Sequence, residues 1–122
     1  MEEVKFDFED LKVYQKALEF VDSIYKITKK FPKEELYSLT SQFIRASNSI
    51  ALNIGEGYGE TIPLFLRYAK IVKGSLRECV VCTTIAFHQS YILEAENNEL
   101  RFKLAEISKM LSGLINYVKS KN

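Results

Sequence analysis

Apolar side chains recur at intervals of three and four residues along most of this chain, and this spacing constrains the fold more than any other feature. It places the apolar side chains on one side of a helix. Four segments show it, at about residues 9–30, 32–57, 62–93 and 98–120. Four amphipathic helices of this length predict an all-α fold, a single antiparallel up-and-down four-helix bundle domain over residues 1–122.

The breaks between the segments contain residues that end or start helices. Phe31-Pro32 ends the first segment and begins the second, because proline disfavours a helical residue before it but suits a first helical turn. Thr61 and Pro63 mark the start of the third segment in the same way. Residues 94–98 have the composition of a loop. In the second segment, the side predicted to face the core consists of Leu36, Leu39, Phe43, Ala46, Ile50, Asn53 and Gly57.

The composition is that of a globular chain and excludes several classes of protein. With 122 residues, 47% hydrophobic and 27% charged, the chain can bury one sizeable core. The net charge of +1 shows no global basic excess, so an electrostatic partner would have to recognise a local patch. No apolar run reaches the length of a membrane span, no signal peptide is visible, and two cysteines suggest reduced thiols. We therefore expect a cytoplasmic protein without a membrane partner.

Residues 79–93 carry no formal charge and are rich in β-branched side chains. Alone, this stretch has the composition of a buried strand. Because no partner strand is predicted nearby, we interpret it as a helix that is apolar nearly all round. Such a helix needs burial on more than one side, which predicts self-association into a homo-oligomer.

The glycine-rich stretch Gly55-Glu56-Gly57-Tyr58-Gly59 has two interpretations. Glycine-rich phosphate loops follow a strand and open a helix, and a P-loop also needs a Lys-Ser/Thr pair. Here the glycines close a predicted helix and no such pair follows. The stretch is therefore better explained as a helix C-terminus followed by a turn.

Residue types that carry catalysis or bind metals are scarce. Cys79 and Cys82 form a lone C-x-x-C in mid-helix, and the single histidine, His88, has Ile85 where a Glu-x-x-His metal pair would need glutamate. We interpret both cysteines as buried apolar residues. The sequence thus predicts no catalytic residues, no metal site, no cofactor and no small-molecule substrate, and the protein is expected not to be an enzyme.

Several motifs in combination resemble the 23S rRNA-intervening-sequence protein family, also called the S23 or "four helix bundle protein" family. The similarity covers nearly the whole chain and is carried by Asp10 to Ala17, Phe31-Pro32 with Glu35, Leu39 to Gln42, Arg45-Ala46, Ser49-Ile50, Asn53-Ile54, Glu56-Gly57, Lys73 to Leu76 and Glu78. The chain has Ile44-Arg45 where the family usually has two arginines, and Glu60-Thr61 where basic residues are common. Both differences remove positive charge.

The resemblance implies a four-helix bundle that assembles as a homopentamer and whose biochemical role is poorly defined. Genes of the family often lie within intervening sequences of rRNA genes. The family fold is similar to the accessory variability protein of diversity-generating retroelements, a pentamer that binds a reverse transcriptase and nucleic acid. The partners implied are therefore further copies of the chain, and RNA, DNA or a nucleic-acid enzyme.

The matching positions include a set of polar residues that helical spacing brings together. The set consists of Arg45, Ser49, Asn53 and Glu56 in the second segment and Ser75 and Glu78 in the third. Buried polar groups must be paired, so these residues are expected to bond one another across the two helices, where Gly74 would allow a close approach. They form either a polar network that fixes the helix register or a site for a ligand or partner.

The third segment also has a basic side, made of Arg67, Lys70, Lys73 and Arg77, with Glu78 as the single acid between residues 62 and 93. In a monomer this side is a solvated surface. In an oligomer it would be repeated in every copy and become a candidate site for a phosphate backbone. Two functions follow: an interaction module for nucleic acid or a nucleic-acid enzyme, and a scaffolding oligomer that binds only protein.

Overall fold

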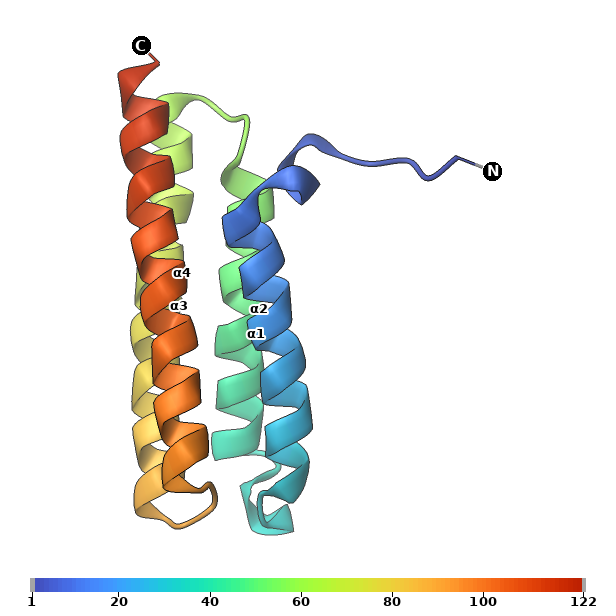
Figure 1. The fold of residues 1–122 in the computed structure, drawn as a ribbon, viewed down its shortest axis with the longest axis vertical. Coiled ribbons are helices and arrows are strands. Elements are labelled where there is room, and N and C mark those ends of the chain that lie inside the picture. Colours follow the sequence, from blue (N-terminus) through green and yellow to red (C-terminus); the bar gives the residue numbers. More distant parts are fainter. Residues whose placement is uncertain (1, 122) are drawn as a thin grey trace.

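A computed structural model describes residues 2–121, and this part of the chain has four α-helices and no strand. The helices are α1 (Lys12–Ile27), α2 (Leu39–Gly57), α3 (Ile62–His88) and α4 (Glu94–Ser120). Consecutive helices run in opposite directions, and α4 returns beside α1 (Figure 1). The predicted all-α fold is confirmed. No helix within residues 2–121 is both long and apolar enough to cross a membrane.

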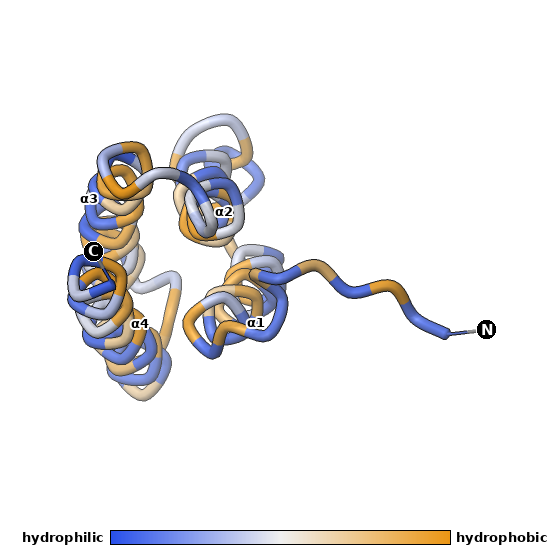
Figure 2. The backbone as a smooth tube through the Cα atoms, turned by 90° about the horizontal axis from the view of Figure 1, so that it is seen from above, coloured by the Kyte–Doolittle hydropathy of each residue, from blue (hydrophilic) through white to orange (hydrophobic). Residues whose placement is uncertain are grey.

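The core lies between the four helices, which occupy the corners of a four-sided bundle in the end-on view (Figure 2). Each helix packs against its two neighbours and contributes one apolar side. The fully buried apolar side chains of largest volume are Phe20, Ile24, Phe43, Ile50, Val72, Ile107 and Leu111. The spacing of three and four residues therefore identified the buried sides of α2, α3 and α4. In α1 it did so only in part: Leu18 and Tyr25, which the same spacing places on the core side, are 42% and 45% exposed, and the buried side is centred on Val13, Ala17, Phe20, Ile24 and Ile27.

The first and second helices are shorter than predicted. Residues 7–10 and 28–30, on either side of α1, form 3₁₀ turns. Before α2, residues 33–35 form another 3₁₀ turn, and Ser38 has φ −126° and ψ −105°, outside the helical region. The carboxylate of Glu35 accepts the Leu39 N–H at 3.3 Å and the Tyr91 hydroxyl at 2.8 Å, the latter bond raising the pKa of Tyr91. Leu36, predicted to face the core, is 51% exposed because it precedes the helix.

The link between α3 and α4 also differs from the prediction. The third helix ends at His88 rather than 93, because Ser90 adopts φ +64° and Tyr91 donates its N–H to Ala86 O at 2.8 Å. Residues 94–98, predicted as a loop, form the first turn of α4. This turn is stabilised by Glu96, whose carboxylate accepts the Leu93 N–H at 2.8 Å and contacts Lys30. These two hydrogen bonds lower the pKa of Glu96.

Candidate functional site

The four cations predicted on the basic side of the third helix, Arg67, Lys70, Lys73 and Arg77, are all exposed on α3. We refer to these four residues as the basic face. None of them forms an ion pair within residues 2–121. The acid nearest to them in the sequence, Glu78, is also exposed and forms no ion pair in that range. The positive charge of the basic face is therefore not neutralised by the rest of the described chain.

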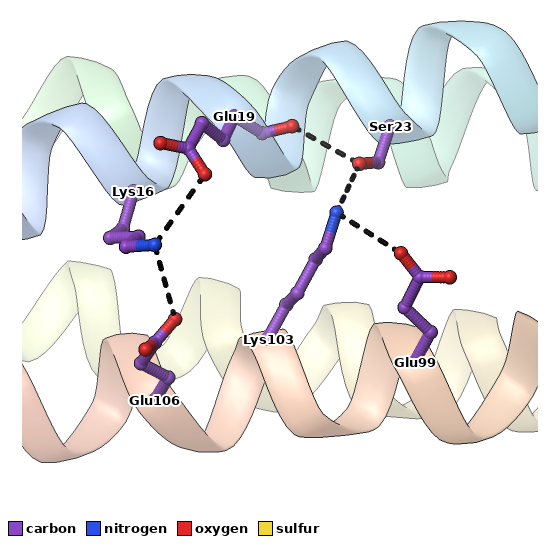
Figure 3. A network of polar contacts seen from close by, with 6 residues as sticks. All are labelled: Lys16, Glu19, Ser23, Glu99, Lys103 and Glu106. Atoms are coloured by element: carbon purple, nitrogen blue, oxygen red, sulfur yellow. Dashed lines mark hydrogen bonds and ion pairs between the residues drawn. The ribbon is translucent and has the colours of Figure 1, made fainter.

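Where α4 packs against α1, the arrangement of charge differs from that of the basic face, because the cations there are paired with acids (Figure 3). Lys16 on α1 lies 3.9 Å from Glu106 and 3.6 Å from Glu19. Lys103 on α4 donates to Ser23 Oγ at 2.9 Å and lies 3.5 Å from Glu99. These contacts connect α1 to α4 and leave little net charge there. An anion approaching the bundle would thus be attracted to α3 rather than to this surface.

The basic face continues into an open groove of about 690 Å³ between α3 and α4. Lys73 and Arg77 line it from α3, and Arg101 lines it from α4, with Phe102 beside it. No carboxylate is among the lining residues. Arg67 and Lys70 do not line the groove.

Arg101 is a site residue that sequence reasoning missed. It lies on a different predicted helix from the basic face, and its own helix carries both positive and negative charges. Its guanidinium Nη1 donates to Thr84 Oγ1 on α3 at 3.1 Å, so the side chain spans the two helices. The sequence does contain a pattern from which Arg101 could have been found. Asn98, Arg101, Ala105 and Ser108 share one side of α4, and all four line the groove.

The predicted polar network is present in part. Asn53 Nδ2 donates to Ser49 O at 2.8 Å and to Ser49 Oγ at 3.0 Å, and Ser75 Oγ donates to Ser49 Oγ at 2.8 Å. These three side chains therefore connect α2 to α3, with Asn53 half-buried at the edge of the core. Arg45, Glu56 and Glu78 are exposed and form no side-chain hydrogen bond or ion pair within residues 2–121. The network that the structure shows is smaller than predicted.

The close approach of the two helix backbones occurs at Gly57 instead of Gly74. A Cβ added to Gly57 would lie 2.7 Å from Tyr68 Cβ, whereas one added to Gly74 would meet no atom within 4 Å. Gly57 is the last residue of α2, and Gly59 follows it with φ +89°. The helix C-terminus and turn predicted for this stretch agree with the structure.

The two cysteines are free and buried, as predicted. Burial, with smaller contributions from Cys82 and Glu78, strongly raises the pKa of Cys79. Burial and then Glu78 raise the pKa of Cys82 to about 11. Both thiols are therefore protonated and poorly nucleophilic near neutral pH. Within residues 2–121, no group of three or more His, Cys, Asp or Glu side chains is placed to hold a metal ion.

The fold and the site together define a small all-helical bundle protein with a cationic groove. The family model of the 23S rRNA-intervening sequence proteins matches residues 9–113, and the chain belongs to this family. The match covers most of the chain and includes α1, α2, α3 and the larger part of α4.

A solved structure shares the fold. It is the crystal structure of a protein of unknown function from the S23 ribosomal protein family of Bacteroides thetaiotaomicron, with 24% sequence identity and a TM-score of 0.78. The similarity covers 85% of this chain and 95% of that one. No curated protein matches the chain. Neither the family description nor the solved structure names a catalytic activity.

Proposed function

We propose that this protein is a non-enzymatic, self-associating helical bundle that binds nucleic acid, alone or together with a nucleic-acid enzyme, through the basic face. The observation that carries the proposal is the cationic surface of α3, which has no ion-pair partner within residues 2–121 and continues into a groove without carboxylates. Phosphate backbones are bound by such local positive surfaces even when the net charge of a protein is near zero.

The proposal is tested by reversing the charge of the basic face. The double variant Lys70→Glu/Lys73→Glu is expected to lose binding to labelled RNA and DNA, measured by fluorescence anisotropy at low salt. Both side chains are exposed, so the fold is expected to persist. In the unmodified protein, the logarithm of the binding constant should fall linearly with the logarithm of the salt concentration. Replacing Lys70 and Lys73 with neutral residues should make that slope shallower by about two.

The matched control is Lys26→Glu/Lys29→Glu, which changes the net charge equally at two exposed positions near the C-terminal end of α1. This control should retain most of the affinity. An equal loss in both double variants would show that net charge, and not the basic face, governs binding. Absence of binding by the unmodified protein at low salt would contradict the nucleic-acid function.

Self-association is supported by the outer side of α3. Ile71, Val81 and Ile85 are exposed there, at 49%, 57% and 41% of their surface. Gly74 lies between them with open space above its Cα, so another helix is able to approach its backbone closely. Exposed apolar side chains around a mid-helix glycine are typical of a helix that packs against a second chain. The assembly proposed is the homopentamer that the family resemblance implies.

Replacing Gly74 with glutamine tests this assembly. Each folded chain should become more stable by roughly 0.5 kcal/mol, because glutamine is the better helix former and meets no atom of its own chain. Assembly should weaken, because the longer side chain blocks close approach of a second copy. Native mass spectrometry of the unmodified protein should show five chains, and Gly74→Gln should shift the distribution towards the monomer.

The control for this experiment is Gly113→Gln, since Gly113 on α4 also has open space where its Cβ would be. It should stabilise the chain without affecting assembly. A Gly74→Gln protein that assembles as the unmodified protein does would exclude this side of α3 as the interface.

The second candidate function is a scaffolding oligomer that binds only protein, and the exposed apolar side chains of α3 favour it. It would be supported if the protein assembles through Ile71, Val81 and Ile85 but binds no nucleic acid at low salt. The non-enzymatic assignment common to both candidates is supported by the protonated, buried cysteines.

A further inference from the structure

The groove between α3 and α4 combines positive charge with an exposed aromatic ring. Phe102 lines the groove next to Arg101, and 70% of its surface is exposed. Lys73 and Arg77 line the same groove from α3. The ring thus contributes little to the core. It lies at the edge of the groove, whose lining includes three cations and no carboxylate, and it also borders a neighbouring pocket that contains Glu19, Glu99 and Glu106. Aromatic rings beside cations are what proteins use to bind unpaired bases and their phosphates together.

The position of Arg101 is set by α3 before any ligand arrives. Its Nη1 donates to Thr84 Oγ1 at 3.1 Å, and Thr84 Oγ1 donates to Val80 O at 2.9 Å. These bonds tie the guanidinium of Arg101 to α3, so less side-chain freedom is lost when an anion binds. The remaining N–H groups of the guanidinium are available to a phosphate.

We propose that this groove binds single-stranded nucleic acid, with an unpaired base stacked on Phe102 and adjacent phosphates held by Lys73, Arg77 and Arg101. The inference rests on the proposed function and specifies its ligand. In a duplex both faces of each internal base are already stacked on neighbouring bases, so duplex nucleic acid offers Phe102 no free ring face. A single strand offers free faces and phosphates together.

An acidic peptide is a less suitable ligand for this groove. Its carboxylates would pair with the cations, but its backbone has no planar ring to cover Phe102. Leu76, Val80 and Ala105 also line the groove and add apolar surface that suits the flat face of a base better than a charged chain.

The test compares three labelled DNA probes of equal length by fluorescence anisotropy at one low salt concentration. The probes are a single-stranded oligodeoxyadenylate, a strand in which every base is missing, and a duplex. The abasic strand keeps the phosphates and removes the stacking partners. We expect the unmodified protein to bind the oligodeoxyadenylate about tenfold more tightly than either other probe.

Variants at Phe102 separate stacking from charge. Phe102→Ala and Phe102→Leu should both weaken binding of the oligodeoxyadenylate about tenfold and leave binding of the abasic strand unchanged. The control Tyr37→Ala removes an aromatic ring that is 92% exposed but lies between α1 and α2, away from the groove, and should have no effect. Circular dichroism of each variant should show an unchanged helical fold.

Each contrary outcome has a separate meaning. Equal affinity for all three probes would overturn the single-strand inference and leave the electrostatic function intact, whereas binding of none would refute the proposed function itself. Unchanged binding by Phe102→Leu would show a general apolar contact in place of stacking and would also overturn the inference. Tighter binding of labelled polyglutamate than of the oligodeoxyadenylate would assign the groove to an acidic protein segment instead.

Discussion

Replacing Gly57 with alanine is expected to lower the free energy of unfolding by about 1–3 kcal/mol. The added Cβ would lie 2.7 Å from Tyr68 Cβ, closer than two such atoms approach in proteins. Tyr68 Cβ is attached directly to the backbone of α3, so a rotation of its side chain cannot relieve the contact. The ends of α2 and α3 would have to separate, which would weaken the packing beneath them. Urea denaturation followed by circular dichroism measures the change.

Gly113→Ala is the matched control for this prediction, because a Cβ at that position meets no atom within 4 Å. In mid-helix it should raise the free energy of unfolding by about 1 kcal/mol. The same substitution thus has opposite signs at two glycines of one chain. A neutral or stabilising Gly57→Ala would show that the two helices are not in close contact in solution.

Replacing Phe43 with alanine is expected to lower the free energy of unfolding by about 3–5 kcal/mol. The side chain is fully buried on α2, and its ring lies 6.5 Å from that of Phe31 in the link between α1 and α2. Truncation would remove buried apolar surface and leave a cavity that the neighbouring helices cannot fill completely. A loss of this size is a large part of the total stability of a small domain and should appear in urea and thermal unfolding alike.

Phe102→Ala provides the contrast for this second prediction. Because most of the Phe102 ring is exposed, its removal should change the free energy of unfolding by less than about 0.5 kcal/mol. Equal losses at the two positions would mean that Phe102 is buried in solution, for example by another copy of the chain. The stability comparison therefore also shows whether the ring of Phe102 is available to a ligand.

The spacing of residues within single helices determined much of what could be predicted. It identified the buried sides of α2, α3 and α4, because a period of 3.6 residues sets which side chains share a side before any partner is known. In α1, apolar side chains lie on more than one side, and only the packing selected Val13 and Phe20 for the core over Leu18 and Tyr25. The spacing also placed Arg67, Lys70, Lys73 and Arg77 together on one exposed surface of α3, and Cys79 and Cys82 in the core.

The ends of the helices were decided by local contacts that composition did not reveal. Ser90 ends α3 through its positive φ, and Ser38 delays the start of α2. Glu96 stabilises a first turn of α4 whose residues have the composition of a loop. Each of these depends on one backbone angle or one hydrogen bond, whereas the apolar pattern averages over many residues.

The contacts between helices were decided by the tertiary structure alone. Spacing places Lys73 and Arg77 on α3 and Arg101 on α4, but the axial register of the two helices brings them to one groove. The register of α2 against α3 likewise brings the backbones close at Gly57 and not at Gly74. It also brings Ser49 to Ser75, while Arg45, Glu56 and Glu78 stay exposed. The physical reason is that a helix has a fixed internal geometry, whereas its rotation and shift against a neighbour are set by the packing of the whole core.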